Sequence, residues 1–568
     1  MLNHIKENIL FMVIIVIFFS ARSLFFGLGK RSLWDPDEGR YAEIPREMIE
    51  MHDYITPHLN YIKYFEKPPL YYWLNVISFK LFGQNEFAAR FFSAIFGIAG
   101  VLLTFFLGFM IFDSLTGFIS AIILLISPLY FILSRINIID PAVSFFITAT
   151  LFSFYLWFLK NEKGNKKNLW LWAFYISMAL AVLTKGLIGV VLPLLVIGIW
   201  IILTRKFSII KDMKLIHGTI IFLAITSPWF IMVSLKNHEF LWFFFIHEHF
   251  LRYLSSIHRR YEPFWFFLVV IIEGFLPWTF FLPSSLILLF SSKKRETKYI
   301  SEGNLFLLLW ITLILGFFSL SHSKLAPYIL PIFPPIAIIV GSFFKQYIKN
   351  EKEYIFIHFS WSLYLLIILG IIIAVAPIAI IIFYPTFEYA SILMKPIFYI
   401  LGLTFLTMAI LAFLFHKKNQ RVATVTTLVL GVALFLGIST NFIPKEIDNE
   451  KSTKSLAKIM SSFLAKDDIV AMYRSFDPSL GFYLKRRIAL VNKVGELRFG
   501  RKHGNLNDEN WFYKADNFKK LWNSQKRVYC VMPKKKYQKF RKEGFKKINF
   551  ITQVDDHILI SNIIRKYK

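Results

Sequence analysis

Thirteen long apolar segments, separated by short polar or basic connections, constrain the fold of this sequence more than any other feature. A helix of roughly 20 apolar residues is long enough to cross a bilayer. The 568 residues are 56% hydrophobic and only 18% charged, and a water-exposed fold cannot bury so much apolar surface. The sequence therefore excludes a soluble enzyme and predicts an all-α polytopic membrane protein with about 13 transmembrane helices, near residues 9–28, 84–112, 117–134, 141–160, 168–183, 186–203, 215–235, 264–290, 304–321, 325–344, 356–384, 392–415 and 422–443.

The basic residues predict which side of the membrane each connection faces. The five connections that follow the even-numbered segments from the fourth to the twelfth hold 18 Lys and Arg, whereas the short connections on the opposite side hold four. Because basic loops stay in the cytoplasm, we expect a cytoplasmic N-terminus. The long loops 29–83 and 236–263 and the segment 444–568 then lie outside the cytoplasm.

Residues 444–568 differ in character from the rest of the chain. They carry 29 Lys and Arg against 13 Asp and Glu, a net charge of +16. A helix-like pattern at 451–465 and strand-like patterns at 469–473, 488–491, 527–532 and 557–562 predict a mixed α/β domain. We therefore divide the chain into a membrane domain, 1–443, and a soluble basic domain, 444–568. Its charge suits anionic lipid or glycolipid partners, and no motif indicates a nucleic-acid partner.

The first external loop concentrates acidic residues. Asp35, Asp37 and Glu38 lie within four positions at the outer end of a membrane segment. Carboxylates in such a place can act as a general base or bind a cation. The alternative is that Asp35 or Asp37 caps a helix over residues 38–50, with further acids in its first turn. The local pattern favours neither interpretation.

Two further segments place ionisable groups near the membrane surface. Glu66 and Lys67 precede a double proline, which holds the charged pair at a rigid kink, and the alternative is an interfacial ion pair. Asp140 opens the fourth apolar segment, where it either caps the helix or projects into a cavity. On local pattern alone, each of these positions allows both interpretations.

The later external connections carry weaker signals. His247 and His249 are two residues apart, whereas helical metal ligands are usually four apart, so the pattern alone is weak evidence for a metal. Arg252 and its basic neighbours suit either a phosphate or lipid headgroups. Lys324 and Tyr328 suit a lipid phosphate, and the alternative is a capped re-entrant turn.

Seven of these segments together resemble one family. They are DPDEGRYAEIPREM at 35–48, YFEKPPLYYW at 64–73, Arg135 to Asp140, TKG at 184–186, HEHFLRY at 247–253, the PF…G…PW…LP pattern at 263–283 and SHSKLAPYILP at 321–331. In this order they are similar to the bacterial aminoarabinose transferases of lipid A, within the protein O-mannosyltransferase-like GT-C glycosyltransferases. The resemblance is close over about residues 10–345 and looser in the C-terminal segment.

The resemblance implies a mechanism and a set of site residues. A sugar would move, with inversion, from an undecaprenyl phosphate carrier to an acceptor, with Asp37 as the catalytic carboxylate and Asp140 in support. The same resemblance implies that the carrier phosphate is held by Arg40, Lys67, Arg252 and Tyr328, and that zinc is held by Glu66 and His247. We add Tyr41 and Lys324 to the predicted phosphate residues and His249 to the predicted zinc ligands. No nucleotide is expected, because a polyprenyl phosphate is already a good leaving group.

The resemblance also implies the substrates and the location, with alternatives. We expect transfer of 4-amino-4-deoxy-L-arabinose or a related sugar to lipid A or another anionic acceptor, by a monomer in the bacterial inner membrane among its lipids. Transfer to protein Ser/Thr or to a polysaccharide is an alternative. A lipid-linked sugar transporter is an alternative from another class, but transporters place their charged residues near the bilayer midplane. A passive assembly protein would leave the acidic loop unexplained.

Overall fold

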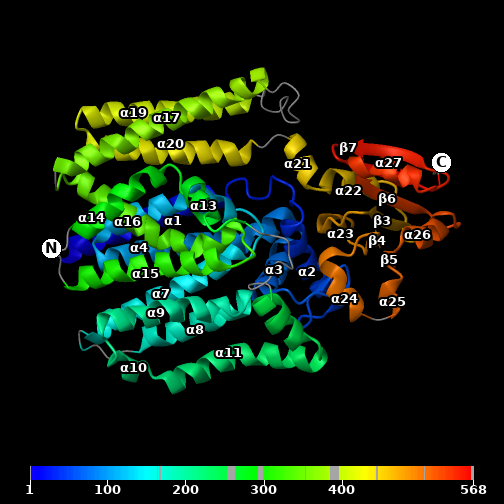
Figure 1. The fold of residues 1–568 in the computed structure, drawn as a ribbon, viewed down its shortest axis with the longest axis horizontal. Helices are drawn as coiled ribbons and strands as arrows, with labels where there is room; N and C mark the ends of the chain where they lie inside the picture. Colours follow the sequence, from blue (N-terminus) through cyan, green and yellow to red (C-terminus); the bar gives the residue numbers. More distant parts are fainter. Residues whose placement is uncertain are drawn as a thin grey trace. The chain divides into compact units, whose positions relative to one another are not determined.

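The computed structural model describes residues 2–162, 164, 168–251, 262–291, 298–351, 353–383, 396–442, 445–504 and 506–563. Its contacts form two compact units, which we describe separately (Figure 1). The membrane unit contains Met1–Phe26, Ser93–Pro228 and Phe245–Phe442. The sheet unit contains Gly27–Phe92, Trp229–Phe244 and Ile443–Lys568. The first external loop therefore shares a unit with the C-terminal segment, and the predicted domain boundary at residue 443 stays a prediction.

The membrane unit is built from helices. Those that lie wholly or partly in it are α1 (Leu2–Phe25), α4 (Glu86–Ile111), α5 (Ser114–Leu125), α6 (Pro128–Leu133), α7 (Asp140–Glu162), α8 (Leu169–Lys185), α9 (Ile188–Thr204), α10 (Ile209–Asp212), α11 (Leu215–Lys236), η1 (Trp242–Leu251), α13 (Phe266–Gly274), η2 (Trp278–Phe281), α14 (Leu282–Ser291), α15 (Lys298–Leu320), η4 (Ala326–Ile332), α16 (Phe333–Ile348), α17 (Glu353–Phe383), α19 (Pro396–Lys417) and α20 (Arg421–Asn441). Each of the thirteen predicted apolar segments holds at least one of these helices.

The helices fall into groups by their length and apolar character. Among the described residues, eight helices are long and apolar enough to cross a membrane, and a ninth candidate is a pair bent by 108° at residues 275–277. Four shorter apolar helices fill the remaining predicted segments, at Ile9–Phe25, Ser114–Leu125, Leu169–Lys185 and Ile188–Thr204. The predicted all-α polytopic fold is thus confirmed, while thirteen stays the predicted number of spans.

Burial distinguishes central helices from peripheral ones. The apolar stretch of α7 is 89% buried within the protein, whereas α19 and α20 are each 28% buried. The backbones of α4 and α5 approach each other closely, because a Cβ atom on Gly117 of α5 would lie 2.9 Å from the Phe109 nitrogen of α4. Small residues of this kind allow helices to pack tightly in membranes. The outer helices leave apolar side chains exposed, as expected where lipid is the solvent.

The sheet unit combines the first external loop with an α/β fold. The loop forms α2 (Asp37–Met51), α3 (Leu70–Phe82) and a short hairpin of β1 (His58–Leu59) and β2 (Ile62–Lys63). The C-terminal segment forms α21 (Lys445–Lys451), α22 (Lys454–Ser461), β3 (Ile469–Tyr473), α23 (Pro478–Leu484), β4 (Ala489–Val491), η5 (Gly495–Leu497), α24 (Arg498–Lys502), α25 (Leu506–Glu509), β5 (Phe512–Tyr513), α26 (Ala515–Trp522), β6 (Val528–Pro533), α27 (Lys534–Lys542), β7 (Asn549–Val554) and β8 (His557–Ser561).

Six of these strands form one sheet, in the order β5-β4-β3-β6-β8-β7. Neighbouring strands from β5 to β6 are parallel, and β8 pairs antiparallel with both β6 and β7. Phe518, Trp522 and Phe540 from α26 and α27 pack in the core of this sheet. The predicted α/β character of residues 444–568 is therefore confirmed.

Candidate active site

The three clustered acids at the start of α2 have different surroundings. Asp35 accepts hydrogen bonds from the backbone nitrogen and the hydroxyl of Ser479. Glu38 is buried, and its carboxylate receives Arg90 Nε and Nη2 at 2.7 and 2.9 Å. The Asp37 side chain is 53% exposed and forms an ion pair with Arg40. Of the three carboxylates, the one on Asp37 is therefore the most accessible to a substrate.

Arg90 shows that Glu38 has a structural role. Besides pairing with Glu38, the Arg90 guanidinium donates to the backbone carbonyls of Leu28, Arg31 and Ser32, at 2.9, 2.7 and 2.6 Å. Arg90 is 1% exposed, so these bonds replace the water that a buried cation loses,. The Glu38–Arg90 pair fixes the chain that leads into α2.

Neither Asp35 nor Asp37 caps α2, although Asp37 and Glu38 lie in its first turn, as the helix-cap interpretation predicted. Helix α2 begins at Asp37 after Pro36, and no side chain caps its first turn. Gly39 explains part of this arrangement, because a Cβ atom there would lie 2.6 Å from the backbone nitrogen of Ser479. A glycine is therefore required for α23 to pack closely against the first turn of α2.

Arg40 connects the first loop to the C-terminal segment. It is buried, it donates to the Tyr64 hydroxyl at 3.1 Å, and it forms ion pairs with Asp37 and Glu496. Burial raises the pKa of the Glu496 carboxyl, while the Arg40 charge opposes that shift. Tyr41 is also buried, and the Arg40 guanidinium lies 5.7 Å from its ring centroid. Sequence reasoning missed Glu496, which lies in the C-terminal segment, where the resemblance to the family is looser.

Tyr72 is a second group that sequence reasoning missed. Its side chain is fully buried on α3, and its ring lies 6.0 Å from that of Tyr41. Among the described residues, its hydroxyl has no hydrogen-bond partner. A buried, unpaired hydroxyl is costly, so this group is available to a ligand beside Arg40. Tyr71 and Tyr72 both belong to the YFEKPPLYYW motif, but the motif did not indicate which of the two belongs to the site.

Glu66 and Lys67 precede α3 and are half-buried. The Lys67 ammonium donates to the Glu66 backbone carbonyl at 2.8 Å. The prolines that follow end in Pro69, which immediately precedes the helix. The rigid entry into α3 thus holds Lys67 beside the loop that carries Tyr64.

A second cluster lies within the membrane unit. Asp140 begins α7 and forms a buried ion pair with Lys185, the last residue of α8. The Lys185 ammonium lies 4.7 Å from the centroid of the Tyr328 ring. The fold thus brings together two predicted site residues, Asp140 and Tyr328, and adds Lys185. The TKG motif at 184–186 was part of the resemblance, but no role was predicted for Lys185.

Two other basic residues of the membrane unit have backbone partners. Lys324 is buried and donates to the Glu262 carbonyl at 2.9 Å. Arg135 donates to the carbonyls of Ser23, Leu24 and Phe26 at 2.6, 3.0 and 2.7 Å. These bonds satisfy carbonyl groups at the C-terminal end of α1 that have no partner within the helix. Arg135 therefore has a structural role.

Of the predicted metal ligands, Glu66 belongs to the sheet unit and His247 to the membrane unit. His247 Nδ1 lies 3.0 Å from a carboxylate oxygen of Glu248 in η1. Across the part of the chain that the structure describes, no group of three or more His, Cys, Asp or Glu side chains could hold a metal. The His249 side chain and Arg252 lie outside the described parts. The predicted zinc site therefore stays a prediction.

Comparison with known proteins identifies the family. The chain is 30% identical over 557 residues to the undecaprenyl phosphate-α-4-amino-4-deoxy-L-arabinose arabinosyl transferase of Wigglesworthia glossinidia brevipalpis, with 94% of each chain covered. This chain belongs to the aminoarabinose transferase family. A second family member, arabinosyl transferase 1 of Proteus mirabilis strain HI4320, is 36% identical over 347 residues, or 59% of each chain.

Two parts of the chain match two different families. Residues 8–251 match the family described as dolichyl-phosphate-mannose-protein mannosyltransferase, and residues 456–562 match the aminoarabinose transferase C-terminal domain. The fold matches the crystal structure of ArnT from Cupriavidus metallidurans bound to undecaprenyl phosphate, with a TM-score of 0.82 and 26% identity over 97% of this chain and 98% of that chain. The protein is thus a multi-span membrane protein of a glycosyltransferase family.

Proposed function

We propose that this protein transfers 4-amino-4-deoxy-L-arabinose, or a closely related sugar, from undecaprenyl phosphate to lipid A. The observation that carries the proposal is the half-exposed carboxylate of Asp37, held by an ion pair with buried Arg40, in a chain of the aminoarabinose transferase family. The names of the related transferases supply the sugar and the carrier. The anionic acceptor suits the net charge of +29,.

Arg40 and Lys67 hold the carrier phosphate in this proposal. In the sheet unit, the charge of Arg40 is balanced by Asp37 and Glu496, so an incoming phosphate competes with two carboxylates. The raised pKa of Glu496 reduces this competition, because the carboxyl takes up a proton more readily than an ordinary glutamate. The buried Tyr72 hydroxyl donates a further hydrogen bond to the phosphate. We propose that Tyr41, Arg252, Lys324 and Tyr328 complete the contacts to the carrier.

The reaction is a single displacement at the anomeric carbon of the sugar. An oxygen of the acceptor forms the new bond, and the bond from that carbon to the carrier phosphate breaks. Undecaprenyl phosphate leaves with the bonding electrons, and Arg40 and Lys67 stabilise the charge that grows on it. Attack from the face opposite the leaving group inverts the configuration.

Asp37 has a role that depends on the acceptor. A hydroxyl must lose its proton as it attacks, and the Asp37 carboxylate accepts that proton. A lipid A phosphate is already anionic and needs little help from a base. For such an acceptor, Asp37 orients the reacting groups and stabilises positive charge on the sugar ring.

Asp140 supports the reaction through Lys185. The buried carboxylate fixes the position of the ammonium, which then lies against the Tyr328 ring. A buried ion pair holds its geometry more firmly than an exposed one. Asp140 is therefore a positioning residue in this proposal.

Zinc remains part of the proposal, with Glu66, His247 and His249 as its ligands. A bound zinc ion would act as a local positive charge near an anionic carrier. Elemental analysis of the purified protein should find about one zinc per chain. A zinc-free preparation with full transferase activity would remove the metal from the proposal.

We further propose the location suggested by the basic loops. The protein would lie in the bacterial inner membrane as a monomer, with a cytoplasmic N-terminus and residues 444–568 in the periplasm. Reporter fusions that are active on only one side of the membrane, placed after residues 213 and 563, test this orientation. A periplasmic signal at residue 213 would reverse it.

Mass spectrometry of lipid A tests the function directly. Lipid A from cells that express the protein should gain the mass of the aminoarabinose residue, and cells with Asp37→Asn or without the protein should lack this increment. A different mass increment would identify another sugar. If lipid A stays unchanged while a glycoprotein or polysaccharide gains a sugar, the acceptor in the proposal is wrong.

A further inference from the structure

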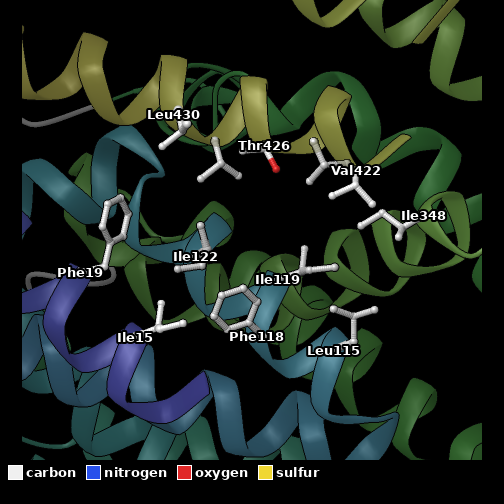
Figure 2. Close-up of a pocket in the computed structure, with 12 residues that line it drawn as sticks. Ile15, Phe19, Leu115, Phe118, Ile119, Ile122, Ile348, Val422, Thr426 and Leu430 are labelled. Carbon is white, nitrogen blue, oxygen red and sulfur yellow. The ribbon is translucent and has the colours of Figure 1, made fainter. Parts of the chain in front are cut away.

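Two apolar cavities lie beside α20 within the membrane unit. The first has a volume of about 340 Å³, and side chains from α1, α5, α16 and α20 line it. Figure 2 shows Val422, Thr426 and Leu430 of α20 on one side of this cavity, and Ile15 and Phe19 of α1 on the other. The second cavity, of about 300 Å³, lies between the last turns of α1 and of α20. Both are lined by Phe19, so the two cavities are neighbours along α20, and we refer to them together as the groove.

The length and lining of this groove match a lipid chain. It extends along α20 from Val422 to Phe442, which is roughly 30 Å at the rise of an α-helix and close to the thickness of a bilayer core. In the first cavity, Thr426 is the only polar residue among those that line it. The predicted residues for the carrier phosphate do not line either cavity.

Arg22 provides a positive charge at one end of the groove. It lies in the last turn of α1 and lines the second cavity. Within the part of the chain that the structure describes, its exposed side chain makes no ion pair or hydrogen bond, and it stacks on the Phe26 ring at 3.8 Å. A cation at the end of a membrane helix is stabilised by an anionic lipid group. Arg22 therefore fits a phosphate.

Asn441 provides a complementary acceptor at the same end. It is the last residue of α20, and its side-chain nitrogen donates to the Gly437 carbonyl at 2.9 Å. Its Oδ1 atom is buried and has no hydrogen-bond partner among the described residues. A ligand that satisfies this atom must bring an O–H or N–H donor.

We infer that this groove binds a glycerophospholipid whose headgroup carries a hydrogen-bond donor, as in phosphatidylethanolamine or phosphatidylglycerol. The phosphate pairs with Arg22, the donor of the headgroup reaches Asn441 Oδ1, and an acyl chain follows α20. The carrier lipid satisfies Arg22 but offers no polar group beyond its phosphate. The inference does not depend on the proposed transferase activity.

Native mass spectrometry of the full-length protein in detergent tests the site. Phosphatidylethanolamine, phosphatidylcholine, phosphatidylglycerol and undecaprenyl phosphate are added one at a time. We expect phosphatidylethanolamine and phosphatidylglycerol to bind at least fivefold more tightly than phosphatidylcholine, whose methylated headgroup cannot donate to Asn441. Equal binding of phosphatidylcholine, or tighter binding of undecaprenyl phosphate, would overturn the inference.

Two glycines give a matched pair of variants. A Cβ atom on Gly437, which lines the second cavity, or on Gly316 of α15 would meet no atom within 4 Å. Replacing a helical glycine also favours the helix, so both variants should fold. Gly437→Phe should lower phospholipid affinity at least fivefold by filling the groove, and Gly316→Phe should leave it unchanged. Wild-type affinity in Gly437→Phe would refute the site.

A second pair of variants tests the positive charge of Arg22. Arg22→Gln should lower the affinity for both donor-bearing lipids at least fivefold. Arg205→Gln changes another exposed arginine at the end of an apolar helix and should have no effect. An equal loss in the two variants would show that lipid binding reflects general surface charge and would overturn the assignment to Arg22.

Discussion

Two aspartates, one in each unit, show how burial assigns different roles to the same side chain. Asp37 in the sheet unit is 53% exposed and pairs with buried Arg40. Asp140 in the membrane unit is 7% exposed and pairs with Lys185, which is also largely buried. An accessible carboxylate can exchange a proton with a substrate, whereas a buried, paired one mainly fixes its partner. The sequence marked both as acids at the ends of membrane segments, and only the tertiary structure shows that their surroundings differ.

Loss of the accessible carboxylate should have the largest effect. Asp37→Asn should lower kcat by about 10²- to 10⁴-fold, the usual range for a group that acts as a general base or stabilises charge in the transition state, and carrier binding should stay measurable. Transfer of radiolabelled sugar by purified protein measures this. Glu50→Gln is a matched control, because Glu50 lies on the same helix, is 49% exposed and pairs with Arg46. Undiminished turnover in Asp37→Asn would end the role of Asp37 in the reaction.

The buried pair should behave as one unit. Asp140→Asn and Lys185→Gln should each lower kcat/KM at least about tenfold, and the double variant should lose no more than the worse single variant. Removing one member of a buried ion pair leaves an uncompensated charge, and contacting residues are not additive. Lys206→Gln, which breaks an ion pair with Glu302 in the same unit, is the control. Additive losses would show that Asp140 acts independently of Lys185.

The cations should affect binding of the carrier. Arg40→Ala and Lys67→Ala should each raise the Kd for undecaprenyl phosphate by about tenfold or more, because a hydrogen bond to a charged group contributes about 1.5–3 kcal/mol. Tryptophan fluorescence during titration with the carrier measures this Kd. Lys63→Ala breaks a pair with Glu239 in the same unit and should change little. Unchanged affinity in both test variants would refute the phosphate assignment.

The smallest effect is expected from Glu47, a buried residue of α2 whose titration should alter the pH dependence of stability. It is fully buried, and burial together with the Glu43 charge raises the pKa of its carboxyl. Between the ordinary glutamate value and this raised pKa, folding takes up a proton, so stability should fall as the pH rises through that range. Glu47→Gln should remove this loss, with a difference of a few °C in the unfolding midpoint, at roughly 2–4 °C per kcal/mol.

Thermal unfolding of both proteins at several pH values measures the Glu47 effect. Glu50→Gln again serves as the control, because Glu50 is half-exposed and should not produce the same change. Parallel pH profiles for the wild type and Glu47→Gln would show that burial of Glu47 does not alter its titration.

The sequence predicted the helices and much of the C-terminal sheet because these depend on local patterns. The strand predicted at 469–473 is β3 with the same bounds, and the patterns at 488–491, 527–532 and 557–562 fall on β4, β6 and β8. β7 was missed because it is an edge strand with mixed exposure. β5 was missed because two residues carry no periodicity.

The site was predicted only in part, because its missing members come from distant positions in the chain. Glu496 contacts Arg40 across 456 positions, and Asp140 contacts Lys185 across 45. Neither partner lies within the local motif of the other. The sequence also could not separate Asp37 from Glu38, since the difference depends on where Arg90 is brought by the fold.

The sequence by itself determined that this is a membrane protein with a basic C-terminal segment, and its motifs identified the family. Hydrophobic length and charge act locally, so they can be read directly from the order of residues. Only the tertiary structure decided which acid is accessible, which arginine is structural and that the Tyr72 hydroxyl has no hydrogen-bond partner among the described residues. Those properties depend on burial and on distant partners, which exist only after the chain has folded.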